Sequence, residues 1–162
     1  CRDCLVSQCF LGWSVDINYN SYNNQRQPSR GGFTPAPAAP VEPKAIPANY
    51  VDLAETLMSA NSRSITTSKL RNWFSIANDI YNVESRSSEI GLKPESCTKL
   101  LNLRVRIVYD AGKDSKIKDF VTSANLLSYI KGIGSSREQM IRFAQYMEAL
   151  VAYHKYFGGR EA

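Results

Sequence analysis

Apolar residues recur along residues 50–162 at the spacing of amphipathic helices. In the first such stretch they fall at i, i+3, i+4, i+7 and i+8 counted from Tyr50, which places them on one side of a helix. Three further stretches repeat this periodicity, and a fourth, residues 95–112, is considered separately below. The sequence therefore predicts five helices, over residues 50–61, about 67–83, 95–112, about 115–131 and 136–157.

Capping residues support several of these boundaries. Thr66, Thr67 or Ser68 can cap the second helix, and Gly132 is a suitable stop for the fourth. Ser135 and Glu138 have the spacing of a capping box before the fifth helix, which Gly158 and Gly159 would end.

The third stretch has a second interpretation, because apolar and polar residues alternate from Leu101 to Asp110 in the manner of a strand. Pro94 and Gly112 fit the two ends of a helix, however, and the sequence offers no second strand for pairing. A lone strand would leave its backbone groups without partners. We therefore expect a helix here.

Six of the seven prolines lie in the first 47 residues, and residues 16–49 show neither helical nor strand periodicity. We expect this part of the chain to be disordered or loosely extended, with a stiff spacer where proline and alanine alternate from Pro35 to Pro47. The predicted architecture is all-α: a compact bundle of about five helices in residues 50–162, behind a tail formed by residues 1–49.

Charge and composition narrow the class of protein. Twenty Lys and Arg residues against fifteen Asp and Glu residues give a formal net charge of +5, which is compatible with a polyanionic partner. No apolar run reaches the roughly 18 residues that a transmembrane helix needs. Four cysteines do not form the dense set of a disulfide-stapled secreted domain, so we expect a cytoplasmic protein.

Catalytic and metal-binding candidates are few. Cys1, Cys4 and Cys9 have metal-like spacing but lack the further cysteines or nearby histidines of a zinc site. His154 is the only histidine, and it lies on the apolar side of the fifth helix, where a structural role is the commoner one. We expect no active site, no metal and no cofactor.

Basic residues near helix ends are the remaining candidates for function. Single Lys and Arg residues on helices usually only contact water, but several here flank loops, from which they could converge on phosphate groups. The predicted RNA-binding residues are Lys69, Arg71, Lys113, Lys131, Arg137 and Arg142.

Three ordered pieces of the chain resemble a known family. They are the closing stretch 143–159, with its Glu-Ala, Ala-Tyr-His-Lys and Gly-Gly sequences, the stretch 66–74 and the stretch 109–113. Together they are similar to the small helical subunit of the type III-A CRISPR effector, the Csm complex. The resemblance covers about residues 65–162, and the family more often has Arg where Lys113 stands.

The resemblance implies a non-catalytic small subunit, repeated along a ribonucleoprotein that acts in antiviral defence. Its expected partners are the guide RNA, the target RNA, other Csm-complex subunits and copies of itself. A guide–target duplex is A-form and presents phosphates and 2′-hydroxyls, which suits a sequence-tolerant basic surface. Two alternatives stay open: a generic helical protein–protein adaptor with incidental positive charge, and a metal-dependent enzyme that uses the N-terminal cysteines.

Overall fold

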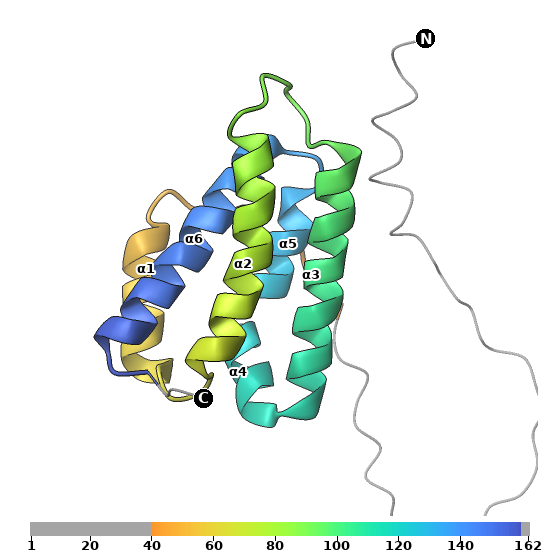
Figure 1. The fold of residues 1–162 in the computed structure, drawn as a ribbon. Helices are drawn as coiled ribbons and strands as arrows, with labels where there is room; N and C mark the ends of the chain where they lie inside the picture. The colour runs from red at the N-terminus through yellow and green to blue at the C-terminus, as the bar shows by residue number, and fades with distance from the viewer. Residues whose placement is uncertain (1–39, 160–162) are drawn as a thin grey trace, which may run out of the picture.

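The structure is a computed structural model that describes residues 40–159. This part of the chain contains six helices (Figure 1). An isolated bridge between Gly91 and Ser136 is the only β pairing in this range. The predicted all-α bundle is confirmed. The helices are α1 (Tyr50–Asn61), α2 (Thr67–Glu84), α3 (Pro94–Lys113), α4 (Ser115–Ser123), α5 (Leu126–Ile133) and α6 (Arg137–Tyr156).

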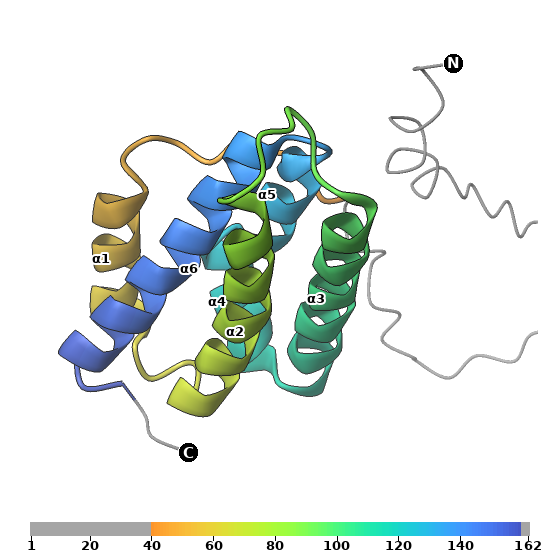
Figure 2. The same ribbon diagram turned by 45° about the horizontal axis from the view of Figure 1, so that its top comes forward.

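Four of the helices lie side by side in the order α1, α6, α2, α3, and the short helices α4 and α5 cover one face of this layer (Figures 1 and 2). The helices α1 and α3 therefore form its two opposite edges. Trp73 of α2, Phe120 of α4 and Phe143 of α6 are the largest fully buried side chains, and all three belong to the core of the bundle. Burial of such aromatic side chains is a major source of stability in a domain of this size.

Helix α3 confirms the choice of helix over strand and explains the alternation in its sequence. Leu100, Leu103 and Ile107 are buried against the bundle, whereas Leu101 and Val105 are exposed on another side of the same helix. A helix with two apolar sides mixes apolar and polar residues in a pattern that can imitate period two. The strand-like pattern is thus a product of two helix faces.

The predicted fourth helix is in fact two helices, α4 and α5, which corrects the expected number of five. Asn125 separates them in a left-handed conformation, with φ 52° and ψ 26°, which asparagine adopts more easily than most residues. A continuous helix would direct Leu126 away from the side that buries Phe120 and Ala124. The break returns Leu126 to the core, where its exposed fraction is 0%.

The N-terminus of α6 also differs in detail from the prediction. Ser136, not Ser135, is the N-cap, and its side chain accepts a hydrogen bond from Gln139 N at 3.3 Å. Glu138 instead binds Arg142, so the predicted capping box of Ser135 and Glu138 is not formed. The residue at the box position is Gln139, and its side chain accepts a hydrogen bond from Ile46 N at 2.9 Å.

Residues 40–49 pack on the bundle, in contrast to the loose tail expected up to Asn49. Ile46 is 1% exposed, and Lys44 N donates to Ser128 O at 3.0 Å. The backbone of Lys44 passes so close to Gly132 that a Cβ there would lie 1.9 Å from Lys44 O. Packed residues thus begin before the predicted boundary at residue 49. Residues 1–39 of the predicted tail lie outside the described range.

Candidate nucleic-acid interface

Five of the six predicted RNA-binding residues lie toward the two ends of the bundle. Lys69 and Arg71 are in the first turns of α2, and Lys113 closes α3, which runs antiparallel to α2. Lys131 at the end of α5 and Arg137 at the start of α6 lie toward the other end. The structure therefore brings three of the six residues to one end.

Asp110 joins α2 to α3 at that end. Its Oδ2 accepts a hydrogen bond from the buried Trp73 Nε1 at 3.0 Å, and its Oδ1 lies 3.5 Å from Lys69 Nζ. The Asp110 side chain is 17% exposed and that of Lys69 36%. The carboxylate partly neutralises Lys69, so the positive charge available to a ligand here comes mainly from its neighbours.

Lys113 is exposed beside an aromatic ring. Its Nζ lies 4.4 Å from the centroid of the Tyr109 ring, within the range of a cation–π interaction. The Tyr109 side chain, the larger cause, together with the Asp110 carboxylate, raises the pKa of Lys113 above its ordinary value. The ammonium group therefore remains charged at neutral pH.

Arg106 belongs to the same surface, although it is not among the six predicted residues. It is exposed on α3, and its guanidinium donates to Asn72 Oδ1 of α2 at 3.5 Å. Its spacing of seven residues from Lys113, close to two helical turns, is the signal that could have identified it. We call Lys69, Arg106 and Lys113 the α2–α3 basic surface; Arg71, two residues after Lys69, lies at the same end of α2 but on another side of the helix.

The other three predicted residues make contacts within the chain. Lys131 Nζ donates to Val41 O at 2.8 Å, and the Arg137 guanidinium donates to the carbonyl oxygens of Ser87 and Glu89 in the α2–α3 loop. Lys131 thus holds the incoming segment 40–49, and Arg137 holds the loop.

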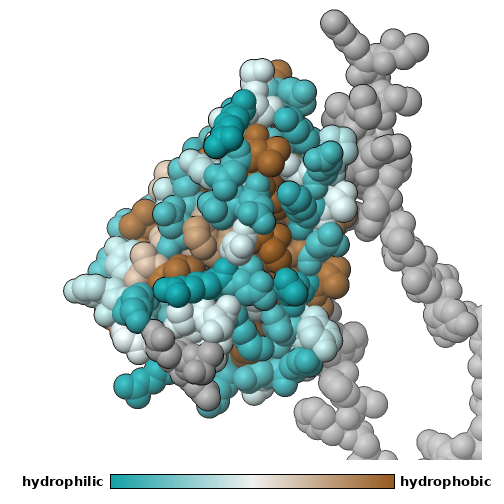
Figure 3. Space-filling model, viewed as in Figure 1, coloured by the Kyte–Doolittle hydropathy of each residue, from teal (hydrophilic) through white to brown (hydrophobic). Residues whose placement is uncertain are grey.

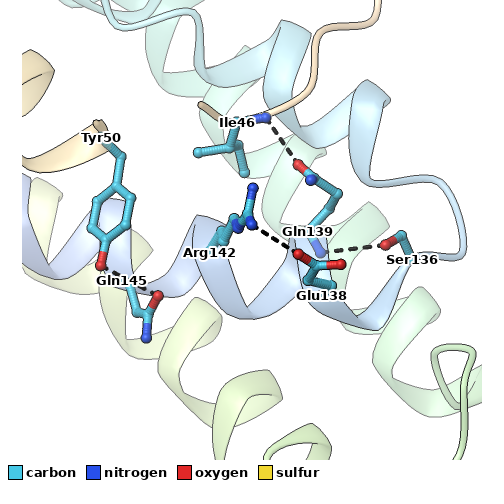
Figure 4. Close-up of polar contacts among 7 residues, drawn as sticks. All are labelled: Ile46, Tyr50, Ser136, Glu138, Gln139, Arg142 and Gln145. Atoms are coloured by element: carbon cyan, nitrogen blue, oxygen red, sulfur yellow. Dashed lines mark hydrogen bonds and ion pairs between the residues drawn. The ribbon is translucent and has the colours of Figure 1, made fainter. Parts of the chain in front are cut away.

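Arg142 lies along the surface of α6 and pairs with Glu138, at 2.8 Å between NH2 and Oε1 (Figure 4). Both side chains are on α6 one turn apart, and the hydrogen bond between Ile46 and Gln139 lies beside them in the same view. A pair at this spacing on an exposed helix contributes a few tenths of a kcal/mol, about 0.2–0.5. RNA contacts by all six predicted residues stay predictions.

His154 has the structural role predicted for it. It is 1% exposed, its Nε2 lies 3.0 Å from Ile65 O, and its Nδ1 lies 3.4 Å from Thr67 Oγ1. The ring therefore joins α6 to the connection between α1 and α2, and it is closed off from solvent. A buried ring with both nitrogens engaged is not placed to exchange protons with a substrate.

Neither a metal cluster nor a membrane span is found within residues 40–159. No three His, Cys, Asp or Glu side chains in that range are grouped to hold a metal ion, and no helix there has the length and apolar character to cross a bilayer. Cys1, Cys4 and Cys9 lie outside the described residues.

Comparison with known proteins identifies related sequences. A family model described as Csm2 Type III-A matches residues 45–160. A protein of Streptococcus thermophilus named CRISPR system Cms protein Csm2 is 38% identical over 119 residues, and one of the same name from Mycobacterium tuberculosis H37Rv is 36% identical over 117. Each of these two matches covers 70% of this chain and 94% of the relative. The family match begins one residue before the buried Ile46.

Proposed function

Because the chain belongs to the Csm2 family of type III-A CRISPR systems, we propose that it is a non-catalytic small subunit that binds the backbones of guide and target RNA. In this role it works in the cytoplasm, beside other subunits of the Csm complex and copies of itself, in antiviral defence. The RNA contact carries no sequence preference.

The observation that carries the RNA proposal is the α2–α3 basic surface. Arg106 and Lys113 are exposed there, and the carboxylate between the two helices, that of Asp110, is engaged by Lys69 and Trp73. Exposed cations on the ends of two adjacent helices can contact phosphates without disturbing the core. An A-form duplex offers phosphates and 2′-hydroxyls along its shallow groove, which such a surface can follow.

A protein–protein adaptor is the second candidate, and one observation favours it: α3 exposes several large apolar side chains. Val105 is 68% exposed and Val108 49%. Such a face indicates a protein contact. An adaptor would bind its partners without RNA, whereas the proposed subunit needs both a protein face and an RNA face.

The test is a salt series of RNA-binding isotherms on the full chain. Replacing Arg106 and Lys113 together by Ala should weaken binding to unrelated duplexes alike, and should reduce the slope of log affinity against log salt by about 1–2, because each cation releases about one counterion. Circular dichroism should show an intact fold, since both side chains are exposed.

A matched control is the double variant Arg86→Ala with Lys99→Ala. It loses the same net charge at exposed positions toward the opposite ends of α2 and α3, on the α2–α3 loop and in the early turns of α3. Its salt slope should stay close to that of the parent. If both double variants change the slope equally, the effect is one of net charge and the assigned surface is wrong. If the parent binds no RNA, the RNA proposal is wrong and the protein–protein adaptor is the better supported function.

A further inference from the structure

The carboxylate of Asp110 is held from inside the bundle. Its Oδ2 accepts the hydrogen bond from Trp73 Nε1 at 3.0 Å, and the Trp73 side chain is 0% exposed. A buried indole N–H needs an acceptor, because leaving it without a partner costs the free energy of its lost hydration. Asp110 therefore keeps its position whether or not its other carboxylate oxygen has a partner.

The other oxygen of this carboxylate faces a loosely held lysine. Lys69 Nζ lies 3.5 Å from Asp110 Oδ1, whereas a charge-assisted hydrogen bond of this kind is usually about 2.7–2.9 Å long. The Lys69 side chain is 36% exposed, and ion pairs that water reaches stabilise a protein only weakly. Lys69 can thus leave Asp110 at a small cost, by rotation of its own side chain.

Two further cations lie beside this pair. Arg106 precedes Asp110 by four residues and Lys113 follows it by three, a spacing that places all three on one side of α3. Asp114, the next acidic residue along the chain, caps the N-terminus of α4. Hydrophilic side chains predominate at this end of the molecule, where α2 begins and α3 ends (Figure 3). Asp110 is thus a carboxylate in contact with Lys69 and flanked by two more cations.

An RNA phosphate offers Lys69 a stronger attraction than Asp110 does. At the α2–α3 basic surface the phosphate is attracted by Arg106 and Lys113 as well as by Lys69, so the three contacts support one another. Each phosphate that a lysine neutralises also releases a condensed counterion from the RNA, a gain that Asp110 does not provide. A phosphate can therefore compete with Asp110 for the same ammonium group.

We propose that Lys69 exchanges Asp110 for an RNA phosphate when the α2–α3 basic surface binds RNA, and that Asp110 limits the affinity by holding Lys69 in the free protein. This inference rests on the proposed function and adds the residue that sets the strength of that site. Asp110 is a positioning residue, because it acts through Lys69. Since Trp73 keeps the carboxylate in place, Lys69 returns to it when the RNA leaves.

The test is a double-mutant cycle on the full chain with Lys69→Ala and Asp110→Asn, measured by duplex RNA-binding isotherms over a salt series. Asparagine has the size of aspartate, and its amide oxygen can still accept from Trp73 Nε1, so the fold should persist. Asp110→Asn should bind about two- to fivefold more tightly than the parent, because no ion pair has to be broken. A variant that folds normally and binds no more tightly than the parent overturns the proposal.

The lysine variant decides whether Lys69 reaches a phosphate. Lys69→Ala alone should reduce the slope of log affinity against log salt by about 1, because one phosphate contact is lost. A slope equal to that of the parent shows that Lys69 stays with Asp110 in the complex, and it overturns the exchange even if Asp110→Asn folds poorly.

The full cycle separates positioning from simple repulsion between Asp110 and RNA. The gain from Asp110→Asn should be smaller when Lys69 is already Ala, because no ion pair is then broken on binding. An equal gain in both backgrounds means that Asp110 acts only by repelling the RNA, and its positioning role is then wrong.

The matched control is Asp79→Asn, the same isosteric loss of charge at an exposed position on α2. It lies about 15 Å further along the helix than Lys69, by the rise of an α-helix. At an ionic strength of about 0.15 M, where screening acts over about 8 Å, it should change RNA affinity much less than Asp110→Asn. Equal gains from the two variants would assign the effect to net charge and overturn the inference.

The same isotherms separate this inference from the RNA proposal. A parent that binds no duplex overturns both. If the salt slope falls in the Arg106→Ala, Lys113→Ala double variant but not in Lys69→Ala, the RNA proposal is supported and the exchange at Lys69 is wrong.

Discussion

At the scale of single residues, the buried side chain of His154 restricts which residues can stand next to it. Its ring contacts Ile65 and Thr67, and the turn after α6 folds back over it, with Gly159 N donating to His154 O at 2.8 Å. Gly158 has φ +66°, a conformation that glycine adopts without strain. The Gly-Gly pair after α6 is thus explained by the buried histidine as well as by the end of the helix.

Replacing Gly159 by Ala should destabilise the protein, because the new Cβ would lie 2.2 Å from His154 Cε1. Displacing a buried ring that holds two hydrogen bonds should cost about 1–3 kcal/mol, the usual penalty of overpacking. Chemical denaturation monitored by circular dichroism measures the loss. The matched control is Gly112→Ala in α3, where no atom lies within 4 Å of the added Cβ. It should stabilise by up to about 1 kcal/mol, and equal effects at both sites would contradict this account.

At the scale of helices, the periodicity of apolar residues was sufficient to locate most of them. The predicted stretch 50–61 coincides with α1, and the capping threonine predicted for the second helix is Thr66, which accepts from Lys69 N at 3.4 Å. The break at Asn125 was not predictable, because Phe120, Ala124, Leu127 and Ile130 form an acceptable stripe on one straight helix. Burial of Leu126 decides against that helix, and this depends on packing with the rest of the bundle.

The break at Asn125 is tested by comparing two substitutions. Asn125→Ala should cost about 1–2 kcal/mol, since alanine in a left-handed conformation is strained. Asn125→Gly loses the same contacts, including the hydrogen bond from Lys44 Nζ at 3.1 Å, but accepts the conformation. Equilibrium unfolding should therefore rank the parent first, glycine next and alanine last. Equal stability of the two variants would show that the lost side-chain contacts, not the backbone conformation, matter here, and a glycine variant less stable than the alanine variant would contradict the left-handed strain.

At the scale of the whole molecule, the sequence identified the fold class and the sign of the surface charge, but not which charges converge. Lys69 and Lys113 come to the same end of the bundle because α2 and α3 are antiparallel neighbours, a relationship that the periodicity does not contain. Lys131 and Arg137 satisfied the same rule of lying near helix ends, yet they bind carbonyl oxygens of Val41 and of the loop after α2. The composition likewise placed residues 40–49 in the tail. Composition does not reveal that a single isoleucine between two prolines, Ile46, is buried in the bundle.

Residues 40–49 should therefore contribute to stability, whereas the composition of residues 1–39 predicts little apolar burial. A chain that begins at residue 40 should keep the thermal midpoint of the parent. A chain that begins at residue 49 loses Ile46 and the hydrogen bonds to Gln139, Ser128 and Lys131, and its midpoint should fall by several degrees.

The single substitution Ile46→Ala in the full chain isolates the apolar part of this effect. Ile46 is 1% exposed, and truncating such a side chain costs about 2–5 kcal/mol, because contacts are lost and a cavity remains. Ile90→Ala removes the same atoms at a position that is 97% exposed, and it should change the free energy of unfolding by less than about 0.5 kcal/mol. If the two variants unfold alike, segment 40–49 does not hold the bundle together. If only Ile46→Ala is destabilised, the folding unit begins before residue 46.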